Sequence, residues 1–249
     1  MKNLLIFVGP SKKFNKAQET LIRIQIDNSY DLGWKKEDII LVTDFEWQYN
    51  GVKAQVLKTD VYYQFDLAAS KIPVIVYLLN QSLIESGELY WSHDLDAYEN
   101  FRIEESELAL DNFDLGLTHY TYKPEWQCGS LFFKQTSKDI FELLDETTRS
   151  RPHLSRNNEK TLTWLIKHNA IDPGRYKRLN VTYNIMTKYL QTIYSLANKP
   201  LKVLHFLPSN KDQSMSATAL EMFMYGKNRL KIPLMSDRLI RIFHQHGVR

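Results

Sequence analysis

The chain has 249 residues, 43% of them hydrophobic and 24% charged, which excludes a disordered protein and suffices for one large α/β domain or two small ones. Its longest apolar runs, residues 4–8 and 73–79, are too short for a transmembrane helix of roughly 20 residues, and its single cysteine, Cys128, excludes a disulfide framework. The net charge of +3 divides into −10 for residues 1–146, with 14 basic and 24 acidic side chains, and +13 for residues 147–249, with 18 and 5.

The first ninety residues alternate between strand-like and helix-like segments. The first apolar run stops at Gly9 and Pro10 and lacks the features of a signal peptide, which predicts a cytoplasmic protein that begins with a buried strand. The alternation predicts an α/β fold with a mainly parallel sheet and helices on both faces. Strands are predicted at residues 4–8, 39–42 and 88–91, and helices up to residue 24 and at residues 65–85, the latter starting or kinking at Pro73.

The rest of the chain is less regular and ends in two short predicted helices. Residues 216–225 and 236–246 each begin with a serine N-cap and are followed by a glycine. Because no repeat or linker marks a boundary, we predict one α/β domain over residues 1–214 and a basic helical extension, residues 215–249, packed on it. Upstream, strands are predicted at residues 115–118, 130–133 and 201–206, and helices at residues 140–147 and 160–168.

Two carboxylates, Asp94 and Asp96, follow the strand predicted at residues 88–91. Ligands of open α/β sheets bind beyond the carboxyl ends of the strands, so this pair is expected at the same edge as the turn at residues 9–11 and Asp44. Hard divalent ions such as Mn²⁺ or Mg²⁺ prefer oxygen ligands and bridge to phosphates. Acidic pairs are also frequent in solvated turns, but the position after a buried strand favours a metal site.

A second polar group follows the strand predicted at residues 201–206. His205 can supply a nitrogen ligand to the same ion, and Lys211, on the loop behind it, can reach phosphate oxygens. Taken alone, these two residues are better explained as a packed histidine and a solvated lysine.

Four motifs together resemble those of a known enzyme family. Asp94-Leu95-Asp96 resembles the Asp-x-Asp metal motif of nucleotide-sugar glycosyltransferases with the GT-A fold. Residues 205–211, His-Phe-Leu-Pro-Ser-Asn-Lys, are similar to the His-Phe-x-Gly-x-x-Lys element of the glycogenin-like retaining members, and residues 127–133 resemble their Asn-Ser-Gly strand. Asn158-Glu159 stands where the family often has Asp-Gln or Asp-Glu. The order and spacing agree over residues 1 to about 211.

The resemblance implies a GT-A-like fold and transfer of a sugar from a nucleotide diphosphate sugar, most often a UDP-sugar, to an acceptor hydroxyl. It implies Mn²⁺ or Mg²⁺ held by Asp94, Asp96 and His205, with Asp96 and Glu159 as the candidate catalytic residues. Glu159 would act as general base of an inverting transfer if it lies near the anomeric carbon; otherwise the resemblance implies retention. The residues expected to contact the donor are Gly9, Pro10, Ser11, Asp44, Lys71, Gly129 and Lys211.

The net charge of +13 on residues 147–249 is larger than the binding of one diphosphate requires. Distributed lysines and arginines of this kind make phosphate-backbone contacts, so one hypothesis is a DNA acceptor, as in phage-type enzymes that attach sugars to hydroxymethylated bases. A second is an anionic membrane surface contacted by the closing helix through Leu239, Ile240, Ile242 and Phe243. A third is a solvated basic face. The residues concerned are Arg149, Arg151, Arg156, Lys160, Lys167, Arg175, Lys177, Arg178, Lys227, Arg229, Lys231, Arg238, Arg241 and Arg249.

Other functions also fit parts of the pattern. A glycosyltransferase acting on a glycan, lipid or protein needs the same donor site. A nucleotidyltransferase would also use paired aspartates, but it normally has a glycine-rich loop after the first strand, where this chain has only Gly9. A non-catalytic nucleic-acid-binding protein would explain the charge of residues 147–249 and leave the aspartate pair, His205 and Lys211 unexplained.

Overall fold

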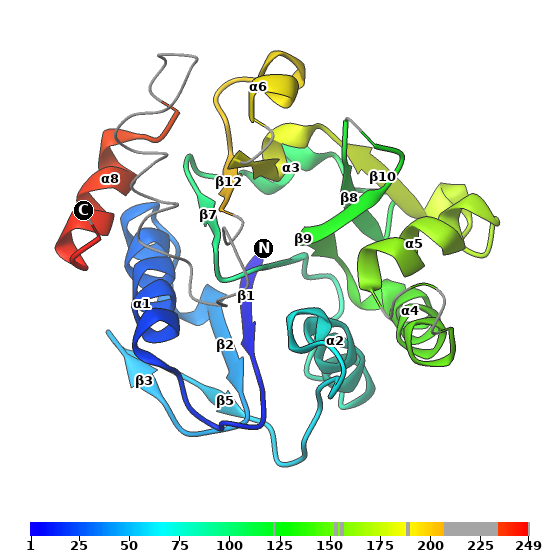
Figure 1. Ribbon diagram of the computed structural model, residues 1–249, viewed down its shortest axis with the longest axis horizontal. Coiled ribbons are helices and arrows are strands. Elements are labelled where there is room, and N and C mark those ends of the chain that lie inside the picture. The colour runs from blue at the N-terminus through cyan, green and yellow to red at the C-terminus, as the bar shows by residue number, and fades with distance from the viewer. Residues whose placement is uncertain (122, 152–153, 155–156, 188–189, 207–233, 249) are drawn as a thin grey trace.

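The computed structural model describes residues 1–248 except 122, 152–153, 155–156, 188–189 and 207–233 (Figure 1). The strands are β1 (Lys2–Phe7), β2 (Ile39–Thr43), β3 (Gln48–Tyr49), β4 (Val52–Lys53), β5 (Gln55–Val56), β6 (Tyr90–His93), β7 (Ala97–Glu99), β8 (Leu115–His119), β9 (Trp126–Phe133), β10 (Tyr176–Leu179), β11 (Ile185–Met186) and β12 (Val203–His205). The helices are α1 (Lys16–Asp31), α2 (Lys71–Asn80), α3 (Glu105–Leu108), α4 (Lys138–Ser150), α5 (Asn158–Lys167), α6 (Leu190–Ile193) and α8 (Asp237–Gln245).

Seven strands form the central sheet, in the order β10-β8-β9-β6-β1-β2-β5. The adjacent strands β6, β1, β2 and β5 run parallel to one another, and so do β10 and β8. Strand β9 runs antiparallel to both of its neighbours, β8 and β6. The predicted α/β fold with a mainly parallel sheet is therefore confirmed. The reversed strand could not be read from residues 130–133, because an apolar run carries no sign of its direction.

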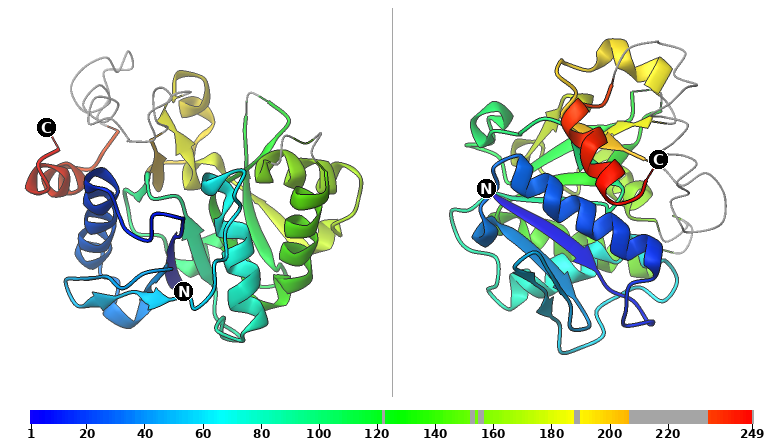
Figure 2. Two further views of the ribbon diagram at one scale, coloured as in Figure 1. Left: turned by 60° about the horizontal axis from the view of Figure 1, so that its bottom comes forward. Right: turned by 90° about the vertical axis from the view of Figure 1, so that its left-hand side faces the viewer.

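Helices cover both faces of this sheet, as Figures 1 and 2 show. On one face, α2, α4 and α5 pack through an apolar core that includes Ile75, Phe141 and Leu162. On the other face, α1 packs through Ile22 and Ile26. Among the described residues, no helix combines the length and the apolar character needed to cross a membrane.

Local sequence explains where α1 and α2 begin. Asn15 caps α1 by accepting from the Gln18 backbone N–H, while the Gln18 side chain accepts from the Asn15 N–H, a reciprocal capping box. In α2, Pro73 lies in the first turn, where a missing N–H costs nothing. The helix predicted over residues 65–85 is wrong in its length, because α2 ends at Asn80 and Ser82 has a φ of 53°.

A small second sheet, in the order β11-β12-β7, joins the carboxyl-terminal part to the turn after β6. The antiparallel pairing of β7 with β12 places His205 opposite Ala97, the residue next to Asp96. The parallel pairing of β11 with β12 places Met186 opposite His205. Strands as short as β11 give no periodic signal in the sequence, so this sheet was not predicted.

The closing helix α8 packs into the protein, and Figure 1 places it alongside α1. Its Ser236 N-cap is confirmed, with the side chain accepting from the Leu239 N–H. The apolar residues Leu239, Ile242 and Phe243 are buried against a core that includes Tyr98 and Phe206. The expectation that they lie on lipid is therefore wrong, because the fold itself covers them. The helix predicted at residues 216–225 and Lys211 lie outside the described residues, and the division at residue 214 stays a prediction.

Replacing Phe243 by alanine tests this packing. The ring is fully buried, so we expect Phe243→Ala to lower the free energy of unfolding by about 3–5 kcal/mol. Arg241→Ala, on the exposed side of the same helix, should change it by less than about 0.5 kcal/mol. Urea unfolding followed by circular dichroism measures both. Equal, small effects would mean that α8 does not pack as described.

Candidate active site

A cleft of about 720 Å³ opens at the carboxyl ends of the central strands. This volume lies within the range of ligand pockets in proteins. Residues from the β1–α1 loop, the start of α2, the β6–β7 turn and the start of α5 line it. The candidate site residues that line it are Gly9, Pro10, Ser11, Lys71, Asp94, Asp96, Gly129, Glu159 and His205.

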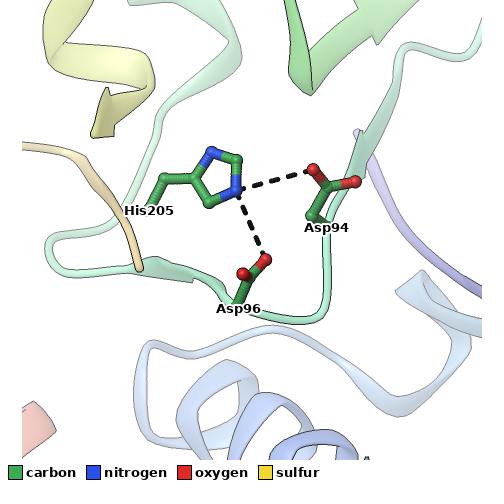
Figure 3. A group of neighbouring side chains, drawn as sticks. All are labelled: Asp94, Asp96 and His205. Atoms are coloured by element: carbon green, nitrogen blue, oxygen red, sulfur yellow. Dashed lines mark ion pairs between the residues drawn. The ribbon is translucent and has the colours of Figure 1, made fainter. Parts of the chain in front are cut away.

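Asp94, Asp96 and His205 converge at one point of this cleft (Figure 3). The His205 Nε2 atom lies 3.5 Å from Asp94 Oδ2 and 3.3 Å from Asp96 Oδ1, and one ligand atom from each residue falls within 4.8 Å of the others. His205 is buried, while the two carboxylates are partly open to the cleft. Two carboxylates and one imidazole suit a divalent ion such as Mn²⁺ or Mg²⁺, so the donor set fits the expected metal.

Backbone hydrogen bonds hold the three side chains in register. The Asp94 N–H donates to the Gly129 carbonyl at 2.9 Å, which ties the turn after β6 to β9. The Phe206 N–H donates to the Asp96 carbonyl, also at 2.9 Å, which ties β12 to the same turn. The sequence expectation that the aspartate pair and His205 meet is thus matched by the geometry.

Gly129 makes room for the His205 ring. A Cβ atom at this position would lie 2.4 Å from His205 Cε1 and 2.6 Å from Nδ1, far inside contact distance. The sequence placed Gly129 among the residues that contact the donor. The structure places it against the Nδ1 and Cε1 atoms of His205, so its lack of a side chain leaves room for the imidazole.

Lys71 neutralises part of the acidic turn. Its ammonium is buried and donates to Asp94 Oδ1 and to the Cys128 carbonyl. The sequence suggested that Lys71 faces the nucleotide, and the structure places it in the same cleft but in contact with the aspartate pair. A cation here reduces the repulsion that two close carboxylates otherwise suffer.

Glu159 lies in the first turn of α5, beside β9. Its carboxylate accepts from the Tyr120 hydroxyl at 2.9 Å and from the Cys128 backbone N–H at 3.1 Å. The positive end of the helix dipole adds to these contacts. Glu159 is therefore fixed in the cleft next to the strand that carries Gly129. Tyr120 was not singled out from the sequence, because its partner lies far along the chain.

The donor side of the cleft differs from expectation at Asp44. This residue is almost completely buried, does not line the cleft, and accepts from the Gly9 N–H at 3.2 Å. Through this hydrogen bond it holds the backbone of the Gly9-Pro10-Ser11 loop. Lys13, on the loop between β1 and α1, and Gln18, in the first turn of α1, were not singled out from the sequence but line the cleft.

Two buried histidines near the site titrate differently. Burial disfavours the charged form of His205, but the charges of Asp96 and Asp94 and the hydrogen bond that the His205 ring donates to Asp96 outweigh it, so the pKa of His205 is raised above its ordinary value of 6.5. Burial lowers the pKa of His93 to about 4. The His93 ring stacks on Trp91 and its Nε2 contacts Asn3 Oδ1 at 3.0 Å, so His93 is a packed residue, as the sequence suggested.

No family model matches the sequence, and no curated protein matches it. Solved structures do. A glycosyltransferase involved in glycosylation of the major capsid of PBCV-1 superimposes with a TM-score of 0.58 at 13% identity, over 90% of this chain and 100% of that one. GlyE of Streptococcus pneumoniae TIGR4, a glycosyltransferase, superimposes with 0.57 at 14% identity, over 99% of this chain and 64% of its own. The galactosyltransferase LgtC superimposes with 0.55 at 13% identity, over 90% and 94%.

The chain has the GT-A fold. The fold that the sequence motifs implied is therefore confirmed. At this level of identity the likeness establishes architecture, and the function must be argued from the site itself. In this GT-A fold, the aspartate pair lies directly after β6 and the histidine closes the site from β12.

Replacing Gly129 by alanine should displace the His205 ring from the two carboxylates. We expect Gly129→Ala to weaken Mn²⁺ binding at least about tenfold, as measured by isothermal titration calorimetry. Gly174→Ala is the matched control, because a Cβ there meets its nearest neighbour, Asp172 Oδ1, at an ordinary 3.4 Å. Unchanged Mn²⁺ affinity in Gly129→Ala would contradict the assignment of His205 as a ligand.

Proton competition at His205 should make metal binding depend on pH. An ion needs the neutral imidazole, so below the raised pKa of His205 each bound ion must displace one proton. We expect the Mn²⁺ affinity to rise about tenfold per pH unit there and to level off above that pKa. His93 stays neutral between pH 5 and 8 and adds nothing. Affinity that is flat from pH 5 to 8 would exclude His205 from the site.

Proposed function

We propose that this protein is a metal-dependent glycosyltransferase that moves a sugar from a nucleotide diphosphate sugar to an acceptor hydroxyl. The observation that carries the proposal is the Asp94, Asp96 and His205 cluster at the open edge of a GT-A sheet. The same cluster is hard to explain in a protein that only binds nucleic acid. A cytoplasmic location stays a prediction from the sequence.

Asp94, Asp96 and His205 would hold Mn²⁺ or Mg²⁺, which supplies positive charge to the departing diphosphate. Lys71, already in contact with Asp94, keeps a second positive charge beside the cluster. Lys211 is proposed to contact the diphosphate on the strength of the sequence motif alone, since it lies outside the described residues. These residues act on the leaving group and leave the choice of acceptor open.

The donor is proposed to be a UDP-sugar, held between the Gly9-Pro10-Ser11 loop and the metal-binding turn. Both features line the same cleft, which is large enough for a nucleotide and one sugar. LgtC was solved with donor and acceptor sugar analogues, which fits a cleft of this architecture. The sequence resemblance to the glycogenin-like members favours UDP over other nucleotides.

Glu159 is proposed to face the transferred sugar. Its carboxylate lies in the cleft, fixed by Tyr120 and by the backbone of β9. An anionic oxygen there would stabilise positive charge that develops on the sugar, or would take the acceptor proton in an inverting transfer. Both stereochemical outcomes remain open, and the anomeric configuration of the product distinguishes them.

A DNA acceptor is a second candidate, favoured by the charge of +13 on residues 147–249. Much of the described basic character is already used within the protein. Arg175 pairs with Asp114 and Asp139, Arg238 with Asp31, and Arg149 with Asp145. Arg151 stacks on Trp164, and Lys177 donates to two backbone carbonyls. A glycan, lipid or protein acceptor is therefore an equal candidate.

Nucleotide binding tests the donor site. With Mn²⁺ and UDP at about 100 times its Kd, the protein should gain about 2.7 kcal/mol of stability, a rise in Tm of roughly 5–11 °C. Asp96→Asn should lose the Mn²⁺-dependent part of this rise, whereas Asp111→Asn, at an exposed position outside the cleft, should keep it. Differential scanning fluorimetry with UDP, GDP and ADP, followed by diphosphate release from the matching nucleotide-sugars, identifies the donor.

The same assay separates the acceptors. Turnover is compared with hydroxymethylated DNA, unmodified DNA, oligosaccharides and water alone, at low and high salt. Stimulation by hydroxymethylated DNA that disappears in high salt supports the DNA acceptor. If no nucleotide stabilises the protein in the presence of Mn²⁺, the glycosyltransferase proposal is wrong.

A further inference from the structure

A buried amide lies directly behind the metal-facing histidine. Asn184 has no exposed surface, and its Oδ1 atom lies 3.0 Å from His205 Nδ1. Asn184 directly precedes β11, whose Ile185 pairs with Leu204, the neighbour of His205. The amide and the imidazole are thus held together by strand pairing as well as by their own contact. The other ring nitrogen, Nε2, is the one that faces Asp94 and Asp96.

In a neutral imidazole, only one of the two ring nitrogens carries a proton. When Nδ1 carries the proton and donates it to a fixed acceptor, Nε2 presents its lone pair. We infer that Asn184 is a positioning residue, whose Oδ1 atom accepts from His205 Nδ1–H and so fixes the ring with Nε2 ready to bind a divalent ion. This inference rests on the metal site of the proposed function and goes beyond it, because Asn184 itself touches neither ion nor substrate.

The remaining half of the Asn184 side chain supports this role. Its Nδ2 atom has no hydrogen-bond partner within the part of the chain that the structure describes. A buried donor without a partner costs stability, so the Nδ2 atom does not explain why an amide lies here. The contact that the amide makes is the one between its Oδ1 atom and His205 Nδ1. Gly129 lies beside the same edge of the ring, where any Cβ would collide with His205 Cε1 and Nδ1 and would lie 3.2 Å from Asn184 Nδ2, so Gly129 leaves room for the ring and the amide together.

Mn²⁺ binding to Asn184 variants tests the inference. Asn184→Leu keeps the size of the side chain and removes the acceptor, so Mn²⁺ affinity should fall about 10- to 100-fold, as for other residues that orient metal ligands. Asn184→Asp keeps an acceptor for Nδ1–H and should bind Mn²⁺ at least as tightly as the wild type. Calorimetric titration with Mn²⁺ alone measures both without any enzymatic turnover.

The chain offers a matched control. Asn3 Oδ1 contacts His93 Nε2 at the same distance of 3.0 Å, and both residues are buried, but His93 does not belong to the metal-binding cluster. Because His93 reaches the cluster through a backbone atom, with its Nδ1 atom 3.1 Å from the Asp94 carbonyl, Asn3→Leu should destabilise the fold and lower Mn²⁺ affinity much less than Asn184→Leu does. If Asn3→Leu and Asn184→Leu weaken Mn²⁺ binding equally, the effect of Asn184 is general and the inference is wrong.

A measurement on the wild-type protein keeps the test decisive even if Asn184→Leu fails to fold. ¹⁵N NMR of the histidine rings, with Zn²⁺ as a diamagnetic probe, should show His205 protonated at Nδ1 and free of a proton at Nε2. The opposite tautomer overturns the inference. Wild-type Mn²⁺ binding with full affinity in Asn184→Leu overturns the inference alone, whereas no Mn²⁺ binding in the wild type overturns the proposed metal site as well.

Discussion

The repulsion between two carboxylates on one tight turn is the constraint around which the site is built. Asp94 and Asp96 approach the same point from the β6–β7 turn and are only partly exposed, so their like charges repel more strongly than they would in bulk water. Lys71 meets one of them, and His205 faces both. A divalent ion would supply the remaining charge and release the proton that the carboxylates draw onto His205. The acidic turn therefore creates both the affinity for a cation and the competition from protons.

This compensation depends on a strand pairing that brings distant parts of the chain together. The aspartates belong to the first half of the sequence, while His205 belongs to a three-residue strand near the carboxyl end. Pairing of β12 with β7 places them side by side, and pairing of β12 with β11 adds Asn184 behind the ring. The small sheet thus serves the site as well as the core, to which its strands contribute Tyr98, Ile185 and Leu204. Its hydrogen bonds position one imidazole against two carboxylates.

The sequence predicted the part of this arrangement that is local or that repeats a known motif. Asp94 and Asp96 follow a buried strand within a few residues, and this position, together with the resemblance to a known motif, indicated a metal site that their spacing alone would have indicated only weakly. Asn184 and Tyr120 gave no such signal, because their roles come from partners that only folding brings near. The expectation that Asp44 contacts the nucleotide failed for a related reason. The sequence correctly places Asp44 after β2, but tertiary packing decides whether its side chain points into the cleft or toward the Gly9 backbone.

The opposite charges of the two parts of the chain acquire a structural meaning from the ion pairs. Within the described residues, every ion pair that involves a basic side chain from residues 147–249 has its acidic partner in residues 1–146. Arg238 and His246 hold the closing helix to α1 through Asp31 and Asp27, and Lys202 joins Glu107 beside the small sheet.

Half-buried pairs near the surface, such as these, each contribute only modestly to stability. Their common direction, however, means that part of the charge segregation serves to attach the carboxyl-terminal elements, including the strand that carries His205, to the half of the protein that carries Asp94 and Asp96. The excess positive charge available to an outside partner is accordingly smaller than the sequence total indicates. If the acceptor is a nucleic acid, the basic residues that do not take part in these pairs would have to bind it.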